Sequence, residues 1–345
     1  MKINETVMKE EKKQRIEAAE KRELLWTEKR IAYNDSWPSQ GIWYSDVQKS
    51  LDNWLREHGL VQLFETIKLS DTSRDVLYKQ AKFNKLVSGI MDIYDELPYR
   101  PDNAFDIAWR SLEILMTHHK NIAWPDDNDK TAHLMSRTAK ELTLPLIEKD
   151  QRVCDMVEAF LADMPLSVLR YAIIRCYIKH DLAINTHIEK VSKRAENIMG
   201  NALYEDIKKQ YKLEEEVKPD ADVERRASLL LQKILKGDQV TVNGNEHQMN
   251  IENRLMFILS CILFTHRCER FHGDYFSPFK SDRASLDTYA FSYYALSFCY
   301  IYFWMILYMH CKWKKIEGIV TLESIIAAAK TIQERLIPLI KEGKQ

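Results

Sequence analysis

Residues 257–274 read Phe-Ile-Leu-Ser-Cys-Ile-Leu-Phe-Thr-His-Arg-Cys-Glu-Arg-Phe-His-Gly-Asp. The first half of this stretch is apolar, the second half is charged, and Gly273 follows the last charged turn. An apolar run that ends in basic residues and is stopped by glycine is typical of a helix that leaves a protein core. Such a helix end is a natural place to present Arg267 and His272, which stand five positions apart.

The composition of the whole chain points to the same kind of fold. Only nine glycines and nine prolines occur among 345 residues, whereas Leu, Lys, Glu, Ile and Ala are plentiful. Few helix breakers and many helix formers predict a nearly all-α protein. Val240–Glu246 contains the one strong hairpin pattern, an Asn-Gly turn beside β-branched residues. We therefore predict an all-α helical bundle with one short β-hairpin.

Apolar residues at helical spacing predict the elements of this bundle. The predicted helices cover about 46–55, 75–94, 102–115, 129–148, 150–163, 165–198, 204–213, 223–235, 249–270, 287–313 and 322–340. An acidic, proline-marked linker near 213–223 is the best candidate for a boundary. We divide the chain into an N-terminal helical region, 1–100, and a helical bundle, 101–345, which contains this linker.

One predicted helix is apolar enough to raise the question of a membrane. Tyr289–Met309 contains no charged residue and is long enough to span a bilayer. Its six tyrosines are spread along the run instead of forming two interfacial belts, which favours a helix buried on all sides. The N-terminus is rich in Lys and Glu and lacks the apolar core of a secretory signal. We expect no stable membrane insertion and a cytoplasmic location.

Charge and cysteine content limit the classes of function. The chain has 50 basic and 51 acidic residues, so any nucleic-acid binding must be local. None of the six cysteines forms a two-residue-spaced pair, which argues against zinc and against disulfides. His118, His119 and His187 have no second metal-type neighbour in the sequence, and we expect them to be structural or surface residues. No metal and no cofactor are predicted.

The segment Arg267-Cys-Glu-Arg-Phe-His272-Gly273 resembles the signature of the HEPN superfamily (higher eukaryote and prokaryote nucleotide-binding). The family motif is an Arg, four to six residues and then a His, at the end of a bundle helix. Many members have an aromatic residue before the His and a Gly after it, as Phe271 and Gly273 are here. The resemblance covers mainly 250–312. It implies an all-α bundle that dimerises so that two motifs meet, and in many members a metal-independent endoribonuclease of antiviral defence or toxin–antitoxin systems.

A second segment repeats the spacing, so the spacing alone is a weak signal. Arg175-Cys-Tyr-Ile-Lys-His180 is expected inside a continuing helix without a Gly after the His, and its context therefore favours the first segment. A single chain that uses both motifs stays open as an alternative. The first segment departs from the family pattern in one respect. HEPN ribonucleases usually carry Asn, Asp or His after the Arg, whereas Cys268 stands here and the polar Glu269 comes one position later.

The chemistry of RNA cleavage without a metal explains the choice of residues. Histidine titrates near neutral pH, so His272 is expected to move the proton of the ribose 2′-hydroxyl, leaving a 2′,3′-cyclic phosphate end. Arginine stays charged and offers two parallel donors, so Arg267 is expected to hold the scissile phosphate. Glu269 lies three residues before His272 and is predicted to orient its ring. The predicted substrate contacts are Arg270, Asp274 and Lys280.

Helical geometry separates the two principal residues. At about 100° per residue, positions five apart lie about 140° apart around a helix. Either the helix unwinds at Phe271–Gly273, or the Arg of one subunit serves the His of another in a two-fold dimer. We therefore predict an RNA substrate, a homodimer, and an antitoxin or other defence-system protein as a partner. The alternative is a non-catalytic helical interaction or regulatory subunit, because basic residues at a helix C-terminus also simply complement the helix dipole.

Overall fold

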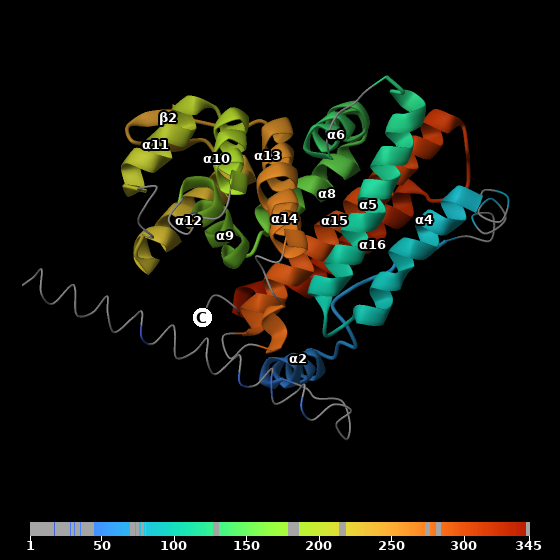
Figure 1. The fold of residues 1–345 in the computed structure, drawn as a ribbon, viewed down its shortest axis with the longest axis horizontal. Helices are drawn as coiled ribbons and strands as arrows, with labels where there is room; N and C mark the ends of the chain where they lie inside the picture. The colour runs from blue at the N-terminus through green and yellow to red at the C-terminus, as the bar shows by residue number, and fades with distance from the viewer. Residues whose placement is uncertain are drawn as a thin grey trace, which may run out of the picture.

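The computed structural model describes residues 45–69, 81–126, 131–178, 186–213, 219–272, 277–280 and 284–342, together with a few single positions before residue 80. Over these ranges the chain is almost entirely helical and contains one two-stranded antiparallel sheet (Figure 1). The predicted all-α class with one short hairpin is confirmed.

The elements follow one another in a simple order. They are α2 (Asp46–Glu57), α4 (Ala81–Met91), η1 (Asp92–Glu96), α5 (Pro101–Ala123), α6 (Thr131–Thr138), η2 (Ala139–Thr143), α7 (Leu144–Lys149), α8 (Gln151–Ala162), α9 (Leu166–Tyr177), α10 (Thr186–Met199), α11 (Asn201–Tyr211), α12 (Ala221–Lys236), β1 (Val240–Val242), β2 (Asn245–His247), α13 (Ile251–Phe257), η3 (Ile258–Leu263), α14 (Phe264–His272), η4 (Pro278–Lys280), α15 (Leu286–Lys314) and α16 (Leu322–Glu342).

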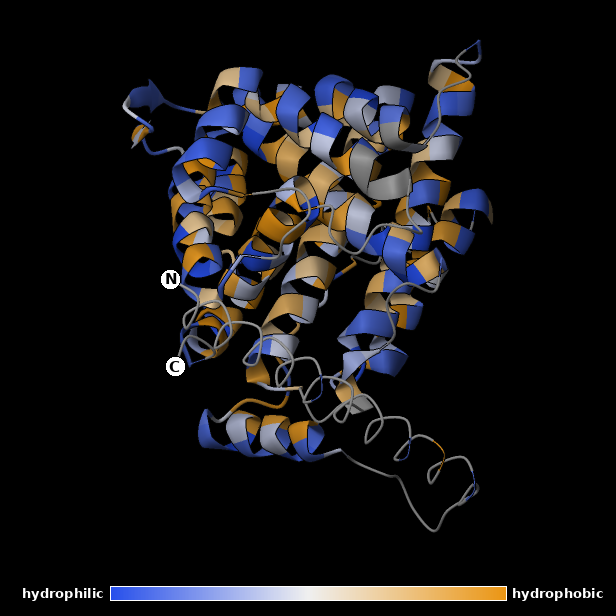
Figure 2. Cartoon of the chain, turned by 60° about the vertical axis from the view of Figure 1, so that its left-hand side comes forward, coloured by the Kyte–Doolittle hydropathy of each residue, from blue (hydrophilic) through white to orange (hydrophobic). Residues whose placement is uncertain are grey.

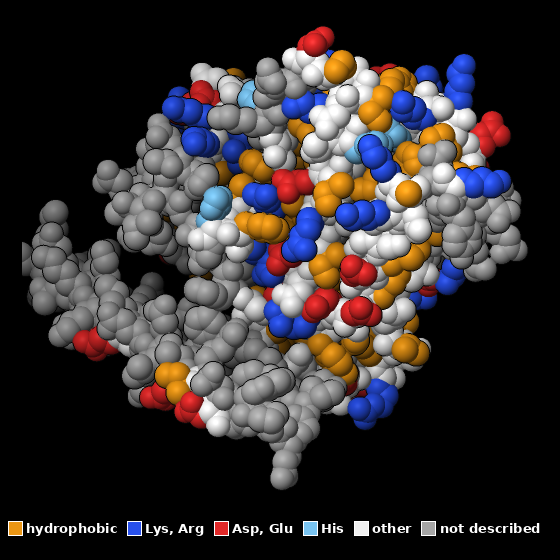
Figure 3. All heavy atoms as spheres, turned by 45° about the vertical axis from the view of Figure 1, so that its right-hand side comes forward, with side chains coloured by type: hydrophobic (Ala, Val, Ile, Leu, Met, Phe, Trp, Pro, Cys, Tyr) orange, Lys and Arg blue, Asp and Glu red, His pale blue; other side chains and the backbone are white. Residues whose placement is uncertain are grey.

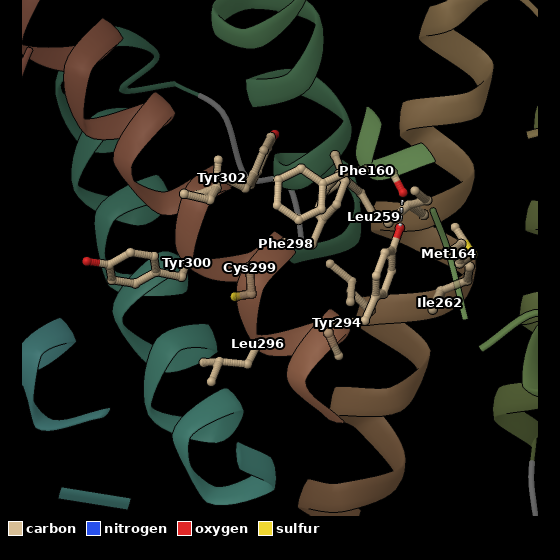
Figure 4. Packing of buried hydrophobic residues seen from close by; sticks show 14 of the residues in the cluster. Phe160, Met164, Leu259, Ile262, Tyr294, Leu296, Phe298, Cys299, Tyr300 and Tyr302 are labelled. Carbon is tan, nitrogen blue, oxygen red and sulfur yellow. Dashed lines mark hydrogen bonds between the residues drawn. The ribbon is translucent and has the colours of Figure 1, made fainter. Parts of the chain in front are cut away.

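Helix α15 is the centre of the bundle and packs along α5 and α16. Its side chains are buried on all sides, as the mixed apolar and tyrosine pattern predicts. Figure 4 shows Tyr294 and Tyr300 leaving the helix in different directions, and the Tyr294 hydroxyl donates to the Phe160 carbonyl at 3.0 Å. Among the described helices, α15 alone is long and apolar enough to cross a membrane, and 94% of its most apolar window is buried inside the protein.

Two predicted helices contain a π-helical turn. The span predicted as 249–270 consists of α13, the π-helical η3 and α14, and the span predicted as 129–148 contains the π-helical η2 between α6 and α7. A π turn inserts an extra residue and rotates every later side chain around the axis. The faces of α14 therefore do not follow from extrapolating α13.

The long helix predicted over 165–198 is wrong. Helix α9 ends at Tyr177, Ile178 is extended, and α10 begins at Thr186. Contacts from α11 explain the end of α9, because Tyr204 stacks on Tyr177 with ring centroids 4.5 Å apart. The hydroxyl of Tyr204 also donates to the carbonyl of Cys176 at 2.7 Å, satisfying a carbonyl at the helix end.

The predicted hairpin forms and packs on α11. Val240 pairs with His247, and the turn residues Asn243 and Gly244 have φ of 50° and 84°, as a tight two-residue hairpin turn requires. Asp206 of α11 accepts hydrogen bonds from the side chains of Asn243, Asn245 and His247. This carboxylate fixes the hairpin to the bundle.

A single hydrophobic core joins the segments on both sides of the predicted boundaries. It includes residues of α2 and α4 as well as residues from 101 onward, and α12, which follows the acidic linker, packs on α8 and α9. Figure 2 shows apolar residues facing inward on the helices and hydrophilic residues facing outward. The indole of Trp54 on α2 donates to Glu342 at the end of α16. The division at residue 100 stays a prediction.

Candidate functional site at the end of helix α14

Helix α14 lies between two groups of helices (Figure 1). α9 and α10 lie on one side of it and α5 lies on the other. The polar and charged side chains of α14 reach both groups, because α5 supplies carboxylates and α9 and α10 supply arginines. The site is therefore built from elements that are far apart in the sequence.

Arg270, which was predicted to contact substrate, lies buried against carboxylates of α5. Its guanidinium binds both oxygens of Asp106, with Nε–Oδ1 at 2.8 Å and Nη2–Oδ2 at 2.6 Å, and Nη1 lies 3.3 Å from Asp102. Only 7% of the Arg270 side chain is exposed. Burial raises the pKa of Asp102, but the interactions with Arg100 and Arg270 lower it by more than burial raises it. The pKa of Asp102 therefore lies below its usual value. Arg270 fixes α14 to α5 as a buried ion pair.

Glu269 also points into the protein. Its side chain is 10% exposed, and its two oxygens face α9. Tyr171 donates its hydroxyl to Oε2 at 3.0 Å, and Arg175 Nε lies 2.6 Å from Oε1. These contacts occupy both carboxylate oxygens and hold α14 against α9. The orientation of His272 by Glu269 stays a prediction.

Arg267 lies nearer the surface. Its Nη2 atom donates to Glu113 of α5 at 3.1 Å, and its Cζ atom lies 4.4 Å from the centroid of the Phe271 ring. The side chains of Arg267 and Glu113 are 21% and 20% exposed, and 44% of Phe271 is exposed. The guanidinium is thus held between an aromatic face and one carboxylate, with an edge open to solvent.

His272 is the last residue of α14 and is exposed. Because α14 stays helical through Phe271 and His272, the two residues do not form an unwound segment that would turn His272 toward Arg267. The regular geometry keeps the separation of about 140° expected for positions five apart. Gly273 and Asp274 lie outside the described residues, as does the side chain of Lys280 in η4.

The two Arg-x4-His segments meet in the structure. Arg175 of the second segment contacts Glu269 of the first, across the interface of α9 and α14. Arg175 lies in the last turn of α9, so the expectation that its helix continues is wrong, and both segments now belong to helix ends. His180 lies outside the described residues. Sequence spacing could not reveal this contact, because nearly a hundred residues separate the partners.

Sequence reasoning also missed His266. Its side chain is buried among Phe105, Tyr171 and Phe291, with ring centroids 5.2, 5.9 and 5.1 Å away. Burial, followed by the positive charge of Arg270, lowers the pKa of His266 to about 3. The ring is therefore neutral at pH 7 and forms part of the wall behind the charged residues of α14.

A second polar cluster lies at the other end of α5. His119 and His310 face each other with Nδ1 atoms 2.7 Å apart, and the ring of His118 lies 5.3 Å from that of His310. Sequence position alone did not indicate His310 of α15 as a neighbour of His118 and His119, which were predicted to be structural or surface residues. In the part of the chain that the structure describes, however, no group of three or more His, Cys, Asp or Glu residues has a geometry that would hold a metal ion.

The surface has no broad region of one charge on the face shown in Figure 3. Basic, acidic and apolar side chains are interspersed there, in keeping with the near-zero net charge.

Comparison of the chain with models of known protein families, with curated proteins and with solved structures finds no match. The functional argument therefore rests on the geometry of α14 and its neighbours.

Proposed function

We propose that this chain is a metal-independent endoribonuclease of the kind found in bacterial defence or toxin-like systems. One observation carries the proposal. Arg267 is partly exposed, is held over Phe271, and lies five residues before the exposed His272 at the end of α14. This arrangement offers a phosphate donor, an aromatic surface for a base and a proton-transfer group at one helix end.

The proposed reaction needs no metal. His272 takes the proton of a ribose 2′-hydroxyl, and the 2′-oxygen attacks the adjacent phosphorus. The bond to the 5′-oxygen breaks, that oxygen receives a proton from water, and a 2′,3′-cyclic phosphate remains. Arg267 stabilises the charge that develops on the phosphate oxygens. Because Arg267 and His272 lie on different faces of α14, we place Arg267 of one subunit with His272 of another in a homodimer.

The test is cleavage of a 5′-labelled single-stranded RNA in EDTA. Arg267→Ala and His272→Ala are each expected to lower the rate by about 10²-fold or more, the usual effect of losing a transition-state donor or a general acid–base group. Arg137 makes a matched control, because it is also held over an aromatic ring, that of Trp124 at 4.3 Å, and also binds a carboxylate, that of Glu141. Arg137→Ala and His133→Ala should cleave like the wild type.

Mixing the two inactive proteins tests the dimeric site. In a random mixture half of the dimers contain one chain of each kind, and one of their two sites is intact, so about one quarter of wild-type activity should return. Cleavage that persists in both single variants would contradict the assignment.

A second candidate function has its own supporting observation. Arg267 and Arg270 both bind carboxylates of α5, which is how a purely structural network would satisfy them. This favours a non-catalytic interaction or regulatory subunit. Under that alternative the wild-type protein cleaves no RNA in the assay above, with or without EDTA.

A further inference from the structure

Arg194 of α10 has an unusual environment at the junction with α14. Its Nη2 atom donates to the Thr265 hydroxyl at 3.0 Å, and its Cζ atom lies 5.3 Å from the centroid of the Phe264 ring. Its Nε atom is buried and has no hydrogen-bond partner among the described residues. These contacts fix the position of the guanidinium, but neither of them neutralises its charge.

The other arginines around α14 differ in this respect. Arg175, Arg267 and Arg270 each bind a carboxylate, those of Glu269, Glu113 and Asp106. Arg194 forms no ion pair within the described ranges of the chain. A partly buried guanidinium without an anion has lost hydration and gained no compensating charge, which is unfavourable. An anionic ligand would supply that compensation.

Arg267 adds a second guanidinium beside this position. Phe264, whose ring Arg194 contacts, lies three residues before Arg267 and four before Cys268, so the three residues share one face of α14. In keeping with this placement, burial raises the pKa of the Cys268 thiol, while the charges of Arg267 and Arg194 both act to lower it. The two arginines belong to different helices, α14 and α10. Two guanidinium groups on neighbouring helices suit a phosphate, which accepts several N–H donors at once.

We propose that Arg194 and Arg267 form a paired site for one phosphodiester of a bound RNA strand. This inference rests on the proposed ribonuclease function and extends it to a residue outside the motif. Arg194 acts in binding: its loss should raise KM and leave kcat nearly unchanged, because it holds substrate and transition state equally. Thr265 and Phe264 position the guanidinium, so Thr265→Val should weaken binding in the same direction as Arg194→Ala but less.

The experiment measures binding separately from cleavage. Fluorescence anisotropy of a labelled single-stranded RNA is followed in EDTA over a series of NaCl concentrations, in a non-cleaving His272→Ala parent. Adding Arg194→Ala should weaken binding about tenfold, as expected for a charged hydrogen bond, and lower the slope of log K against log salt by about 0.7, the value for one lost phosphate contact. Arg194→Lys should keep the slope and recover part of the affinity.

Arg226 provides the control. It is an exposed helix arginine of α12 paired with Asp222, and Arg226→Ala should leave both affinity and slope unchanged. Thermal unfolding of each variant checks that it folds. An unchanged salt slope in the folded Arg194→Ala protein would overturn the site.

The outcome separates this site from the ribonuclease proposal. RNA binding that depends on Arg194, without any cleavage by the wild type, would leave the phosphate site standing and remove the enzymatic function. If the wild type binds no RNA, its Tm in sodium phosphate is compared with its Tm in sodium chloride of equal ionic strength, which tests whether the site binds phosphate at all. A phosphate-specific rise in Tm that is lost in Arg194→Ala supports an anion site for another phosphate ligand, and its absence refutes the pair.

Discussion

Near its N-terminus, helix α5 places Asp102 and Asp106 against Arg270 of α14, whereas near its C-terminus it places His119 against His310 of α15. Asp102, His119 and His310 are all at most 1% exposed. The first cluster buries full charges, and each charge has an opposite partner. The second buries two imidazoles, and burial keeps them neutral.

The pKa values express this difference. Interactions with Arg100 and Arg270 overcome the effect of burial and hold the pKa of Asp102 below its usual value. Burial, the largest cause, lowers the pKa of His119 to about 4 and that of His310 to about 3. One end of α5 is therefore stabilised by charge, and the other end is stable only while it carries no charge. The residues proposed to cleave RNA lie beside the charged end.

The largest expected effect comes from breaking the ionic end. Arg270→Ala removes the partner of Asp106 and leaves Asp102 buried beside Arg100 alone, so we expect a loss of about 3–5 kcal/mol in the free energy of unfolding. Urea unfolding followed by circular dichroism measures it. Arg226→Ala, which breaks an exposed pair, should lose less than about 1 kcal/mol. Equal losses in the two variants would show that the buried network contributes no more than a surface pair.

The histidine end should respond to pH. Histidine in the unfolded chain has a pKa near 6.5. Between pH 6.5 and about 4 the unfolded chain therefore binds protons at His119 and His310, whereas the folded protein keeps both rings neutral. Stability is fully present above pH 6.5 and is lost progressively as the pH falls toward 4. Charged and titratable groups around the pair are His118, Glu141 and Lys314.

The variant His310→Gln isolates this effect. It removes one titrating ring but keeps a polar group opposite His119, so the fall in stability between pH 6.5 and 4 should become shallower than in the wild type. His266 titrates in the same direction and is present in both proteins, so its contribution cancels in the comparison. Parallel curves for the two proteins would contradict the assignment of the acid sensitivity to this pair.

The smallest expected effect concerns the contact between α9 and α14. Tyr171→Phe deletes the hydroxyl that donates to Glu269 but leaves Arg175 in place, so we expect a loss of about 1–2 kcal/mol in the free energy of unfolding. Chemical unfolding measures the loss, and RNA cleavage should stay near the wild-type rate. A loss as large as that of Arg270→Ala would indicate that Tyr171, and not Arg175, is the main partner of the carboxylate.

The sequence predicted much of the local structure. Helices near 46–55, 150–163, 223–235, 287–313 and 322–340 form close to the expected bounds, and the Asn-Gly hairpin forms where its turn residues require it. These successes depend on apolar spacing and turn chemistry, which are properties of neighbouring residues. The errors have a different origin. The helix predicted over 165–198 ends at Tyr177. There the hydroxyl of Tyr204, which belongs to another helix, donates a hydrogen bond to a carbonyl in the last turn of α9.

The candidate site likewise contains residues that the local sequence indicated and residues that only the fold brings to them. Arg267 and His272 were recognisable as residues at the end of a helix, and the sequence placed them about 140° apart. Their neighbours were not recognisable, because Glu113, Arg175 and Arg194 lie roughly 70 to 150 residues away along the chain and no local pattern connects them. Arg270 was predicted to contact substrate and Glu269 to orient His272, and neither prediction indicated that the two side chains are buried. Their burial depends on which partners the fold brings to them.

The sequence by itself determined an all-α chain, a buried tyrosine-rich central helix, one hairpin, and a helix that ends in Arg267 and His272. These features follow from interactions between residues that are close along the chain. Only the tertiary structure decided which charges are buried, that the two Arg-x4-His segments share a contact, and that Arg194 has no carboxylate partner among the described residues. The physical reason is that the cost of a buried charge is set by the groups around it, and folding supplies those groups from distant helices.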